Sequence, residues 1–395
     1  MTYNIYADNA ATTRVCDEAL AAMLPFFSEQ YGNASGNYKI AMTNRKAIDQ
    51  ARETIANGIG ATDRRHIYFT GSGTEADNWA IKGVAFANRE KGNHIITTAI
   101  EHHAVLHPCD DLVRNHGFQV TYLPVDETGR VPIEALTAAI RPETILISVM
   151  FANNETGVIQ PIRVIGAIAK AHQIIFHTDA VQALGHVPID VVKDNIDLLS
   201  VSAHKVYGPK GVGALYIGER VNIRPLIHGG AQERHRRAGT ENVAGIVGFG
   251  VAAELATKAL ESENGRLKKL TDMLIDGILE NVPFAKLNGD RVHRMPHIAN
   301  FSFQFIEGEG LLMFLDNCGI VAASGSACTS GTFEPSHVLL AMGGDEAASH
   351  GSLRVSLGRY NTEEEVTQVI EAVTKIVGQL RSMSPAYEAY LHDKK

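Results

Sequence analysis

Cysteine is scarce in this chain: its 395 residues include four, Cys16, Cys109, Cys318 and Cys328, and no pair has CxxC spacing. That count excludes a disulfide scaffold, so we expect reduced thiols. Cys16, Cys109 and Cys318 are explained as small core or near-surface residues. Cys328 has only small and hydroxylated neighbours, which predicts an exposed thiol on a mobile loop.

Long apolar runs and positive charge are also lacking. No stretch has the length of a membrane-spanning helix, and the first residues do not resemble a secretory signal, so we expect a cytoplasmic protein without a membrane partner. With 36 Lys and Arg against 44 Asp and Glu, the formal net charge is -8 at pH 7. Nucleic-acid and anionic-membrane binders carry broad positive surfaces, so we expect no direct nucleic-acid binding.

What the chain does contain is a regular alternation of short apolar strands and amphipathic helices. Residues 144–149 form an apolar run typical of a strand that is buried on both faces of a parallel sheet. The alternation predicts an α/β fold with a mostly parallel sheet and helices on both faces. The length suits a large domain plus a smaller one, and the composition changes near Leu255. Thr362 and Glu365 have the spacing of a capping box before a final helix.

Two polar residues at predicted strand ends carry the main functional signal. Asp179 follows the apolar run 174–176, and Lys205 follows the next apolar run. Open α/β sheets bind ligands at the carboxyl ends of their strands, so both residues are expected to face one site. Pyridoxal phosphate requires an aspartate beside its ring nitrogen and a lysine that forms a Schiff base with it. On spacing alone, a surface lysine in a turn is an equal alternative for Lys205.

Three motifs make the chain resemble the cysteine desulfurases of the NifS/IscS type, which are class V, fold-type I pyridoxal phosphate enzymes. They are YADNAATT at residues 6–13, SGSACTSG at residues 324–331 and SLGRY at residues 356–360. The resemblance implies a fold-type I transferase with a large cofactor-binding domain at residues 16–257. A smaller α+β domain would comprise residues 1–15 and 258–395 and carry the catalytic cysteine loop at about 324–334. The chain departs from the family at Ala34, where a proline is usual, and near Tyr38, where a histidine is usual, so the resemblance does not predict the local shape of the pocket entrance.

The resemblance also implies an activity. The enzyme would remove sulfur from L-cysteine, release L-alanine and leave a persulfide on Cys328, as a sulfur donor for iron–sulfur cluster assembly and other thio-cofactors. Lys205 would hold the cofactor and move the Cα proton, and Asp179 would keep the ring nitrogen protonated. The thiolate of Cys328 would attack the substrate sulfur, with Gly325 and Gly331 as hinges of its loop.

A glycine-rich turn at residues 71–75 opens a predicted helix, where backbone N–H groups favour a phosphate, although an ordinary strand-to-helix turn looks the same. By resemblance, His102 stacks on the cofactor ring and transfers protons, whereas the adjacent histidine has no assigned role. No metal is expected, since no known ligand spacing is present. Arg354 and Asn154 are implied for the substrate carboxylate. The implied cofactor-binding residues are Gly73, Thr74, His102, Asn154, Asp179, Gln182, Ser202, His204, Lys205 and Thr240.

The segment 233–240 is the most basic part of the chain. A solvated loop is the default interpretation and a nucleic-acid contact is a second one. The resemblance implies a homodimer, in which Thr240 touches the phosphate of the partner's cofactor. It also implies a sulfur-acceptor or iron–sulfur scaffold protein as partner; a nitrogenase-type, general iron–sulfur or thiolation pathway stays open.

Three alternative functions remain at this point. A class V aminotransferase shares the lysine and the aspartate but has no use for Cys328. A selenocysteine lyase needs the cysteine less, because selenium leaves more easily. A catalytically inactive scaffold that binds an acceptor protein would not need the intact set of Lys205, Asp179, His102 and Cys328.

Overall fold

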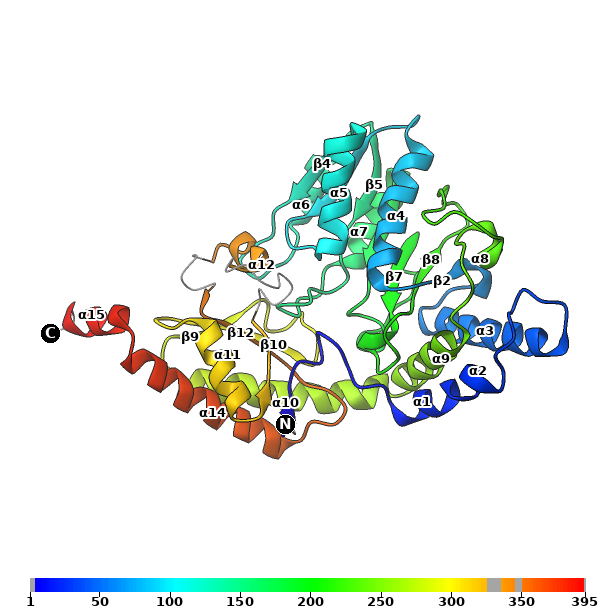
Figure 1. Ribbon diagram of the computed structural model, residues 1–395. Helices are drawn as coiled ribbons and strands as arrows, with labels where there is room; N and C mark the ends of the chain where they lie inside the picture. The colour runs from blue at the N-terminus through cyan, green and yellow to red at the C-terminus, as the bar shows by residue number, and fades with distance from the viewer. Residues whose placement is uncertain (1–3, 325–334, 345–349, 394–395) are drawn as a thin grey trace.

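The computed structural model describes residues 4–324, 335–344 and 350–393 (Figure 1). Its largest sheet has seven strands in the order β2-β8-β7-β6-β5-β3-β4. The pairs among β4, β3, β5, β6 and β7 are parallel, whereas β8 is antiparallel to both β7 and β2. This sheet confirms the predicted mostly parallel α/β fold. The strands are β2 (Ile67–Thr70), β3 (His94–Thr98), β4 (Gln119–Leu123), β5 (Thr144–Ser148), β6 (Ile175–Asp179), β7 (Leu198–Ser202) and β8 (Gly213–Ile217).

Helices cover both faces of this sheet, which explains why its inner strands are apolar without alternation. Successive residues of a strand point to opposite faces. Ile95 packs in the same cluster as side chains of α4 and α5, whereas Ile96 packs in the cluster on the other face. Helices near the sheet are α1 (Asp17–Met23), α2 (Pro25–Ser28), α3 (Lys39–Gly58), α4 (Gly73–Asn88), α5 (His103–His116), α6 (Ile133–Ala139), α7 (Ile162–Ala171), α8 (Gln232–His235) and α9 (Val243–Lys258).

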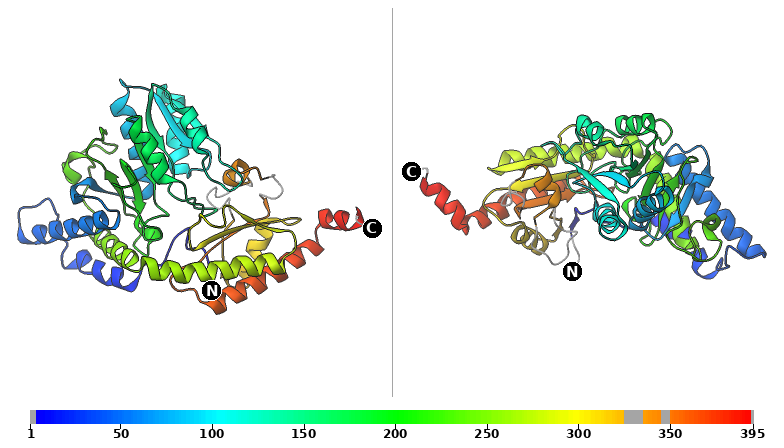
Figure 2. Two further views of the ribbon diagram at one scale, coloured as in Figure 1. Left: turned by 180° about the vertical axis from the view of Figure 1, so that it is seen from behind. Right: turned by 90° about the horizontal axis from the view of Figure 1, so that it is seen from above.

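A second, separate core lies in the C-terminal part and includes the N-terminal strand. The antiparallel sheet β12-β10-β9 packs with long helices, and β1 (Ile5–Tyr6) pairs in parallel with β11 (Ile320–Val321). Figures 1 and 2 show α10 and α14 side by side beneath this sheet. Its other elements are α10 (Leu260–Asn281), β9 (Ala285–Asn288), β10 (Ile298–Phe303), α11 (Gly308–Asn317), β12 (Ser352–Ser356), α14 (Glu363–Ser382) and α15 (Pro385–Asp393). The short helix α12 (His337–Ala341) instead packs its buried Val338 and Leu339 into the core of the large sheet.

The connection between the two cores runs from α9 into α10, and these helices meet at an angle of 73°. The predicted domain boundary at 257/258 stays a prediction; in the structure α9 ends at Lys258 and α10 begins at Leu260. Within the described part of the chain, no single helix is long and apolar enough to cross a membrane, and only this bent pair has the length and composition when taken together.

The capping box of α14 provides a test of the C-terminal core. Thr362 Oγ1 accepts a hydrogen bond from the Glu365 N–H, and the Glu365 carboxylate accepts one from the Thr362 N–H, both at 3.3 Å. Thr362→Ala should lower the free energy of unfolding by about 1 kcal/mol, measured by urea denaturation. The control is Thr367→Ala inside the same helix, where alanine has the better helix propensity and no loss is expected. Equal effects of Thr362→Ala and Thr367→Ala would contradict the assignment of Thr362 as the helix cap.

Candidate active site

Asp179 and Lys205 lie at the carboxyl ends of adjacent parallel strands. Asp179 ends β6, and Lys205 ends a short 3-10 helix that directly follows β7. The Asp179 carboxylate is 7 % exposed and accepts a hydrogen bond from the Val181 N–H at 2.9 Å. Burial raises the pKa of Asp179 to about 6, and the positive charge of Lys205 acts in the opposite direction. The two residues therefore share one electrostatic environment, as the strand-end pattern predicts.

The N-terminal segment of the chain holds the lysine. Lys205 Nζ donates hydrogen bonds to the carbonyl oxygens of Ala10 and Ala11, the latter at 2.8 Å. Gln182 Nε2 donates to the same Ala10 carbonyl at 2.8 Å. Thr13 Oγ1 donates to the His204 carbonyl oxygen at 2.9 Å. These contacts bring Gln182, His204 and Lys205 together around one stretch of backbone.

The start of α4 lies beside this group and packs closely against the chain that follows Asp179. Gly73 is the first residue of the helix, and a Cβ atom there would lie 2.6 Å from Val181 Cγ2. The Ser72 hydroxyl caps the helix by accepting a hydrogen bond from the Glu75 N–H at 3.1 Å. Thr74 is exposed. Backbone N–H groups at a helix start favour a phosphate, so this turn fits the phosphate of a cofactor.

His102 is a neutral imidazole in this environment. Its Nδ1 accepts a hydrogen bond from the Ala104 N–H at 3.1 Å and caps α5, which leaves the ring proton on Nε2. Burial and then the nearby charge of Lys205 lower the pKa of His102 to about 4. Burial likewise lowers the pKa of His204 to about 4, and its Nδ1 lies 3.1 Å from Thr12 Oγ1. Both rings are therefore uncharged near neutral pH.

Arg354 joins the site from the small sheet. Its side chain is 3 % exposed on β12, and Nη1 donates a hydrogen bond to the Asn154 carbonyl oxygen at 2.9 Å. Nη2 forms an ion pair of 2.7 Å with Asp8. The structure thus brings Arg354 and Asn154 together, as the resemblance implies. Asp8 belongs to the YADNAATT motif, but neither the sequence pattern nor the resemblance indicated a role for it.

Buried ionisable residues that were not expected from the sequence lie near Asp179. Asp77 and His177 are almost fully buried, with 3.6 Å between Asp77 Oδ1 and His177 Nε2. Burial, and then the charge of Asp179, raises the pKa of Asp77 well above its usual value, and burial raises that of Glu101 to about 8. Burial lowers the pKa of His177 to about 3. His177 could have been found from the sequence, because it is a polar residue inside the apolar strand β6.

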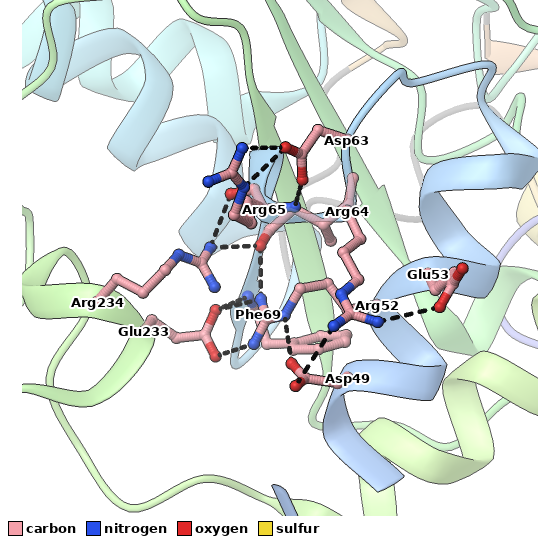
Figure 3. Close-up of polar contacts among 10 residues, drawn as sticks. Asp49, Arg52, Glu53, Asp63, Arg64, Arg65, Phe69, Glu233 and Arg234 are labelled. Atoms are coloured by element: carbon pink, nitrogen blue, oxygen red, sulfur yellow. Dashed lines mark hydrogen bonds and ion pairs between the residues drawn. The ribbon is translucent and has the colours of Figure 1, made fainter. Parts of the chain in front are cut away.

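The basic segment is fixed to the sheet rather than solvated throughout (Figure 3). The buried Glu233 carboxylate accepts two hydrogen bonds from Arg52, both at 2.7 Å, and one from the Phe69 N–H at 2.9 Å. Arg237 pairs with Glu75 of α4 through contacts of 2.8 and 3.0 Å. The solvated-loop interpretation is therefore wrong for Glu233. Thr240 is exposed, and a single chain does not test its expected contact with a partner.

Cys328 and the hinge residues Gly325 and Gly331 lie outside the described residues. The described chain before them stays close to Arg354, because Ala323 and Arg354 form a backbone bridge through hydrogen bonds of 2.6 and 3.1 Å. In the part of the chain that the structure describes, no group of three or more His, Cys, Asp or Glu side chains is arranged to hold a metal ion.

Comparisons with known proteins agree with this geometry. Residues 5–369 match the family model described as Aminotransferase class-V. A protein named cysteine desulfurase IscS from Methanosarcina thermophila is 59% identical over 381 residues, covering 96% of this chain and 94% of that protein. A protein of the same name from Clostridium botulinum strain Hall is 55% identical over 397 residues and covers 100% of both chains. A solved structure titled NIFS-like protein is 39% identical, with a TM-score of 0.90 over 96% of this chain and 100% of that chain.

The chain therefore belongs to the class V aminotransferase family. Within that family it belongs with the cysteine desulfurases of the NifS/IscS type. Its cofactor is accordingly pyridoxal phosphate, held through a lysine Schiff base. The glycine-lined start of α4, the buried Asp179 and the half-buried Lys205 fit that group. The predicted family, fold and cofactor are confirmed, whereas the roles of the individual site residues stay predictions.

The substitution Gly213→Ala tests the phosphate site at the start of α4. A Cβ atom on Gly213 would lie 2.6 Å from Ser72 C and 2.8 Å from Val201 O, so Gly213→Ala must displace the turn before Gly73. We expect the affinity of the cofactor-free protein for pyridoxal phosphate to fall about tenfold, or about 1.4 kcal/mol, in an absorbance titration. Gly265→Ala is the control, since nothing lies within 4 Å of its added Cβ. An unchanged affinity in Gly213→Ala would contradict the assignment of this turn as the phosphate site.

Glu101 gives the cofactor-free protein a pH-dependent stability. Its pKa rises from 4.5 to about 8 through burial, so between these values the unfolded chain loses a proton that the folded chain keeps. This residue's contribution to stability is complete below pH 4.5 and is lost as the pH rises toward 8, by up to about 1.4 kcal/mol per pH unit. Glu101→Gln should remove that slope in urea unfolding, whereas the exposed Glu280→Gln should retain it. Parallel profiles for wild type and Glu101→Gln would refute the assignment.

Proposed function

We propose that this chain is a cysteine desulfurase that transfers the sulfur of L-cysteine to Cys328 and releases L-alanine. The observation that carries the proposal is the convergence of Asp179, Lys205 and Arg354 in a chain of the NifS/IscS type. The reaction balances without an oxidant: L-cysteine and the Cys328 thiol become L-alanine and a Cys328 persulfide. The C–S bond of the substrate breaks, and an S–S bond forms on the protein.

Each residue at the strand ends has a proposed task. When bound, pyridoxal phosphate supplies an electron sink that weakens the bonds at Cα of the substrate. Asp179 holds the ring nitrogen protonated, and Gln182 donates a hydrogen bond to the ring hydroxyl oxygen. Lys205 anchors the cofactor and moves the proton at Cα. His102 would stack on the ring and transfer protons through Nε2, which carries the ring proton because Nδ1 accepts the hydrogen bond from the Ala104 N–H.

The remaining residues bind charged groups. Gly73, Thr74, Ser202 and His204 would hold the cofactor phosphate, and Arg354 with Asn154 would bind the α-carboxylate of L-cysteine. An arginine suits this task because its planar group donates two parallel hydrogen bonds to a carboxylate.

We further propose a homodimer in which Thr240 reaches the phosphate of the partner's cofactor. The rigid attachment of the basic segment supports this arrangement, because Glu233 is anchored to Arg52 and Arg237 to Glu75. Such anchoring fixes the place from which Thr240 extends.

The persulfide would be passed to a sulfur-acceptor or iron–sulfur scaffold protein, for iron–sulfur cluster assembly and for other thio-cofactors. The names of the relatives and the four cysteines without CxxC spacing support this role in the reducing cytoplasm.

Cys328→Ala tests the proposed nucleophile. The variant should keep the visible absorption of its cofactor, because the residues that hold the ring are unchanged. Its rate of sulfide or persulfide formation from L-cysteine should fall by about 10³-fold or more, as is typical when a nucleophile is removed.

The matched control is Cys318→Ala, which removes an exposed cysteine next to β11. It should retain the wild-type rate. A Cys328→Ala enzyme that still delivers sulfur at the normal rate would overturn the assignment, and an efficient half-reaction with a keto acid would favour an aminotransferase.

A further inference from the structure

Arg354 is already paired with a carboxylate of the protein itself. Its Nη2 lies 2.7 Å from Asp8 Oδ1, and among the described residues Asp8 is the one carboxylate within ion-pair distance of this guanidinium group. The Arg354 side chain is 3 % exposed and that of Asp8 is 16 % exposed, so solvent screens the pair only weakly. An incoming substrate carboxylate would therefore meet an arginine whose charge is largely neutralised.

The backbone holds Asp8 in this place. The Ser356 N–H donates to the Ala7 carbonyl oxygen at 2.8 Å, and the Asn9 N–H donates to the Ser356 carbonyl oxygen at 3.2 Å. Ser356 Oγ also accepts a hydrogen bond from the Ala10 N–H at 2.9 Å. These bonds hold the backbone of Asp8 beside β12, which places its carboxylate next to Arg354.

The guanidinium group also has a donor without a protein partner. Arg354 Nε is buried and has no hydrogen-bond partner within the described part of the chain. A buried donor left unpaired costs free energy, and native proteins rarely retain one without a reason. Nη1 is bonded to Asn154 and Nη2 to Asp8, so the two protein contacts leave hydrogen-bonding capacity on this guanidinium group unused.

We propose that Asp8 sets the affinity of the site for α-carboxylates by opposing their binding to Arg354. The inference rests on the proposed role of Arg354 as the substrate-carboxylate residue. A ligand carboxylate on the same guanidinium group would lie within a few ångströms of the Asp8 carboxylate. Like charges at that distance repel each other strongly in a site that is screened poorly.

The consequence of this repulsion concerns the product more than the reaction. L-alanine carries the same α-carboxylate as L-cysteine, so any gain in binding through Arg354 applies to both. Interactions that stabilise the substrate, product and transition state equally do not accelerate the chemical step, and they slow product release. Asp8 is in this view a positioning and affinity-setting residue that keeps L-alanine from accumulating in the site.

Asp8→Asn separates charge from position, because the amide oxygen still accepts the Nη2 hydrogen bond. In the holoenzyme, KM for L-cysteine and the dissociation constant of L-alanine should fall together by about tenfold, with kcat equal or lower. The L-alanine constant is measured directly by titration calorimetry, so one readout does not depend on turnover. Thermal unfolding of the variant verifies that it is folded.

Asp17→Asn is the matched control. It removes the same charge from the N-terminal region, where Asp17 pairs with the exposed Arg14, and both constants should stay at wild-type values. Asp8→Ala removes the acceptor as well as the charge, so its gain should be smaller than that of Asp8→Asn. Constants for Asp8→Asn that stay within about twofold of wild type, or rise, overturn the inference.

Arg354→Gln distinguishes failure of this inference from failure of the proposed function. If Arg354→Gln weakens L-alanine binding while Asp8→Asn does not tighten it, only the role of Asp8 is wrong. If Arg354→Gln leaves L-alanine binding unchanged, the substrate role of Arg354 is wrong and the inference falls with it.

Discussion

The geometry of the site depends on one segment of backbone that contacts both cores. Residues 8–13 accept hydrogen bonds from Lys205 on the side of the large sheet and provide the Asp8 carboxylate for Arg354 on the side of the small sheet. β1, which ends one residue before this segment begins, belongs to the C-terminal core through its pairing with β11. The distance between the lysine and the arginine is thus set by a segment that both cores hold, so a shift of either core is transmitted to the site.

Burial without compensating charge is the second constraint on this site. Removal from water raises the pKa values of Asp179, Glu101 and Asp77 and lowers that of His177. Glu101 and His177 are therefore neutral near pH 7. Such surroundings leave an ionised Asp179 with Lys205 as its cationic neighbour. A protonated ring nitrogen beside Asp179 would supply a second opposite charge, in agreement with the role that we propose for this aspartate.

The sequence predicts those features that depend on local pattern. Apolar runs identified the buried strands, and polar residues directly after two of them located Asp179 and Lys205. The antiparallel placement of β8 and β2 was not predictable, because strand order depends on non-local pairing. The pair of Asp8 and Arg354 joins residues 346 positions apart, so no local pattern indicates it. The buried side of the basic segment was hidden for the same reason, since Arg52 lies 181 positions before Glu233.

The basic segment has a strained backbone conformation, and a buried ion pair maintains it. Glu233, Arg234 and His235 have consecutive positive φ angles of 43°, 58° and 64°. Residues other than glycine rarely adopt this backbone conformation. The bidentate pair with the buried Arg52 retains this conformation, and breaking such a pair would leave a buried charge unpaired. Strain of this kind persists only where the surroundings determine it and is concentrated at functional positions. Thr240 at the end of the segment is exposed, which is compatible with the contact that we propose between this residue and a second chain.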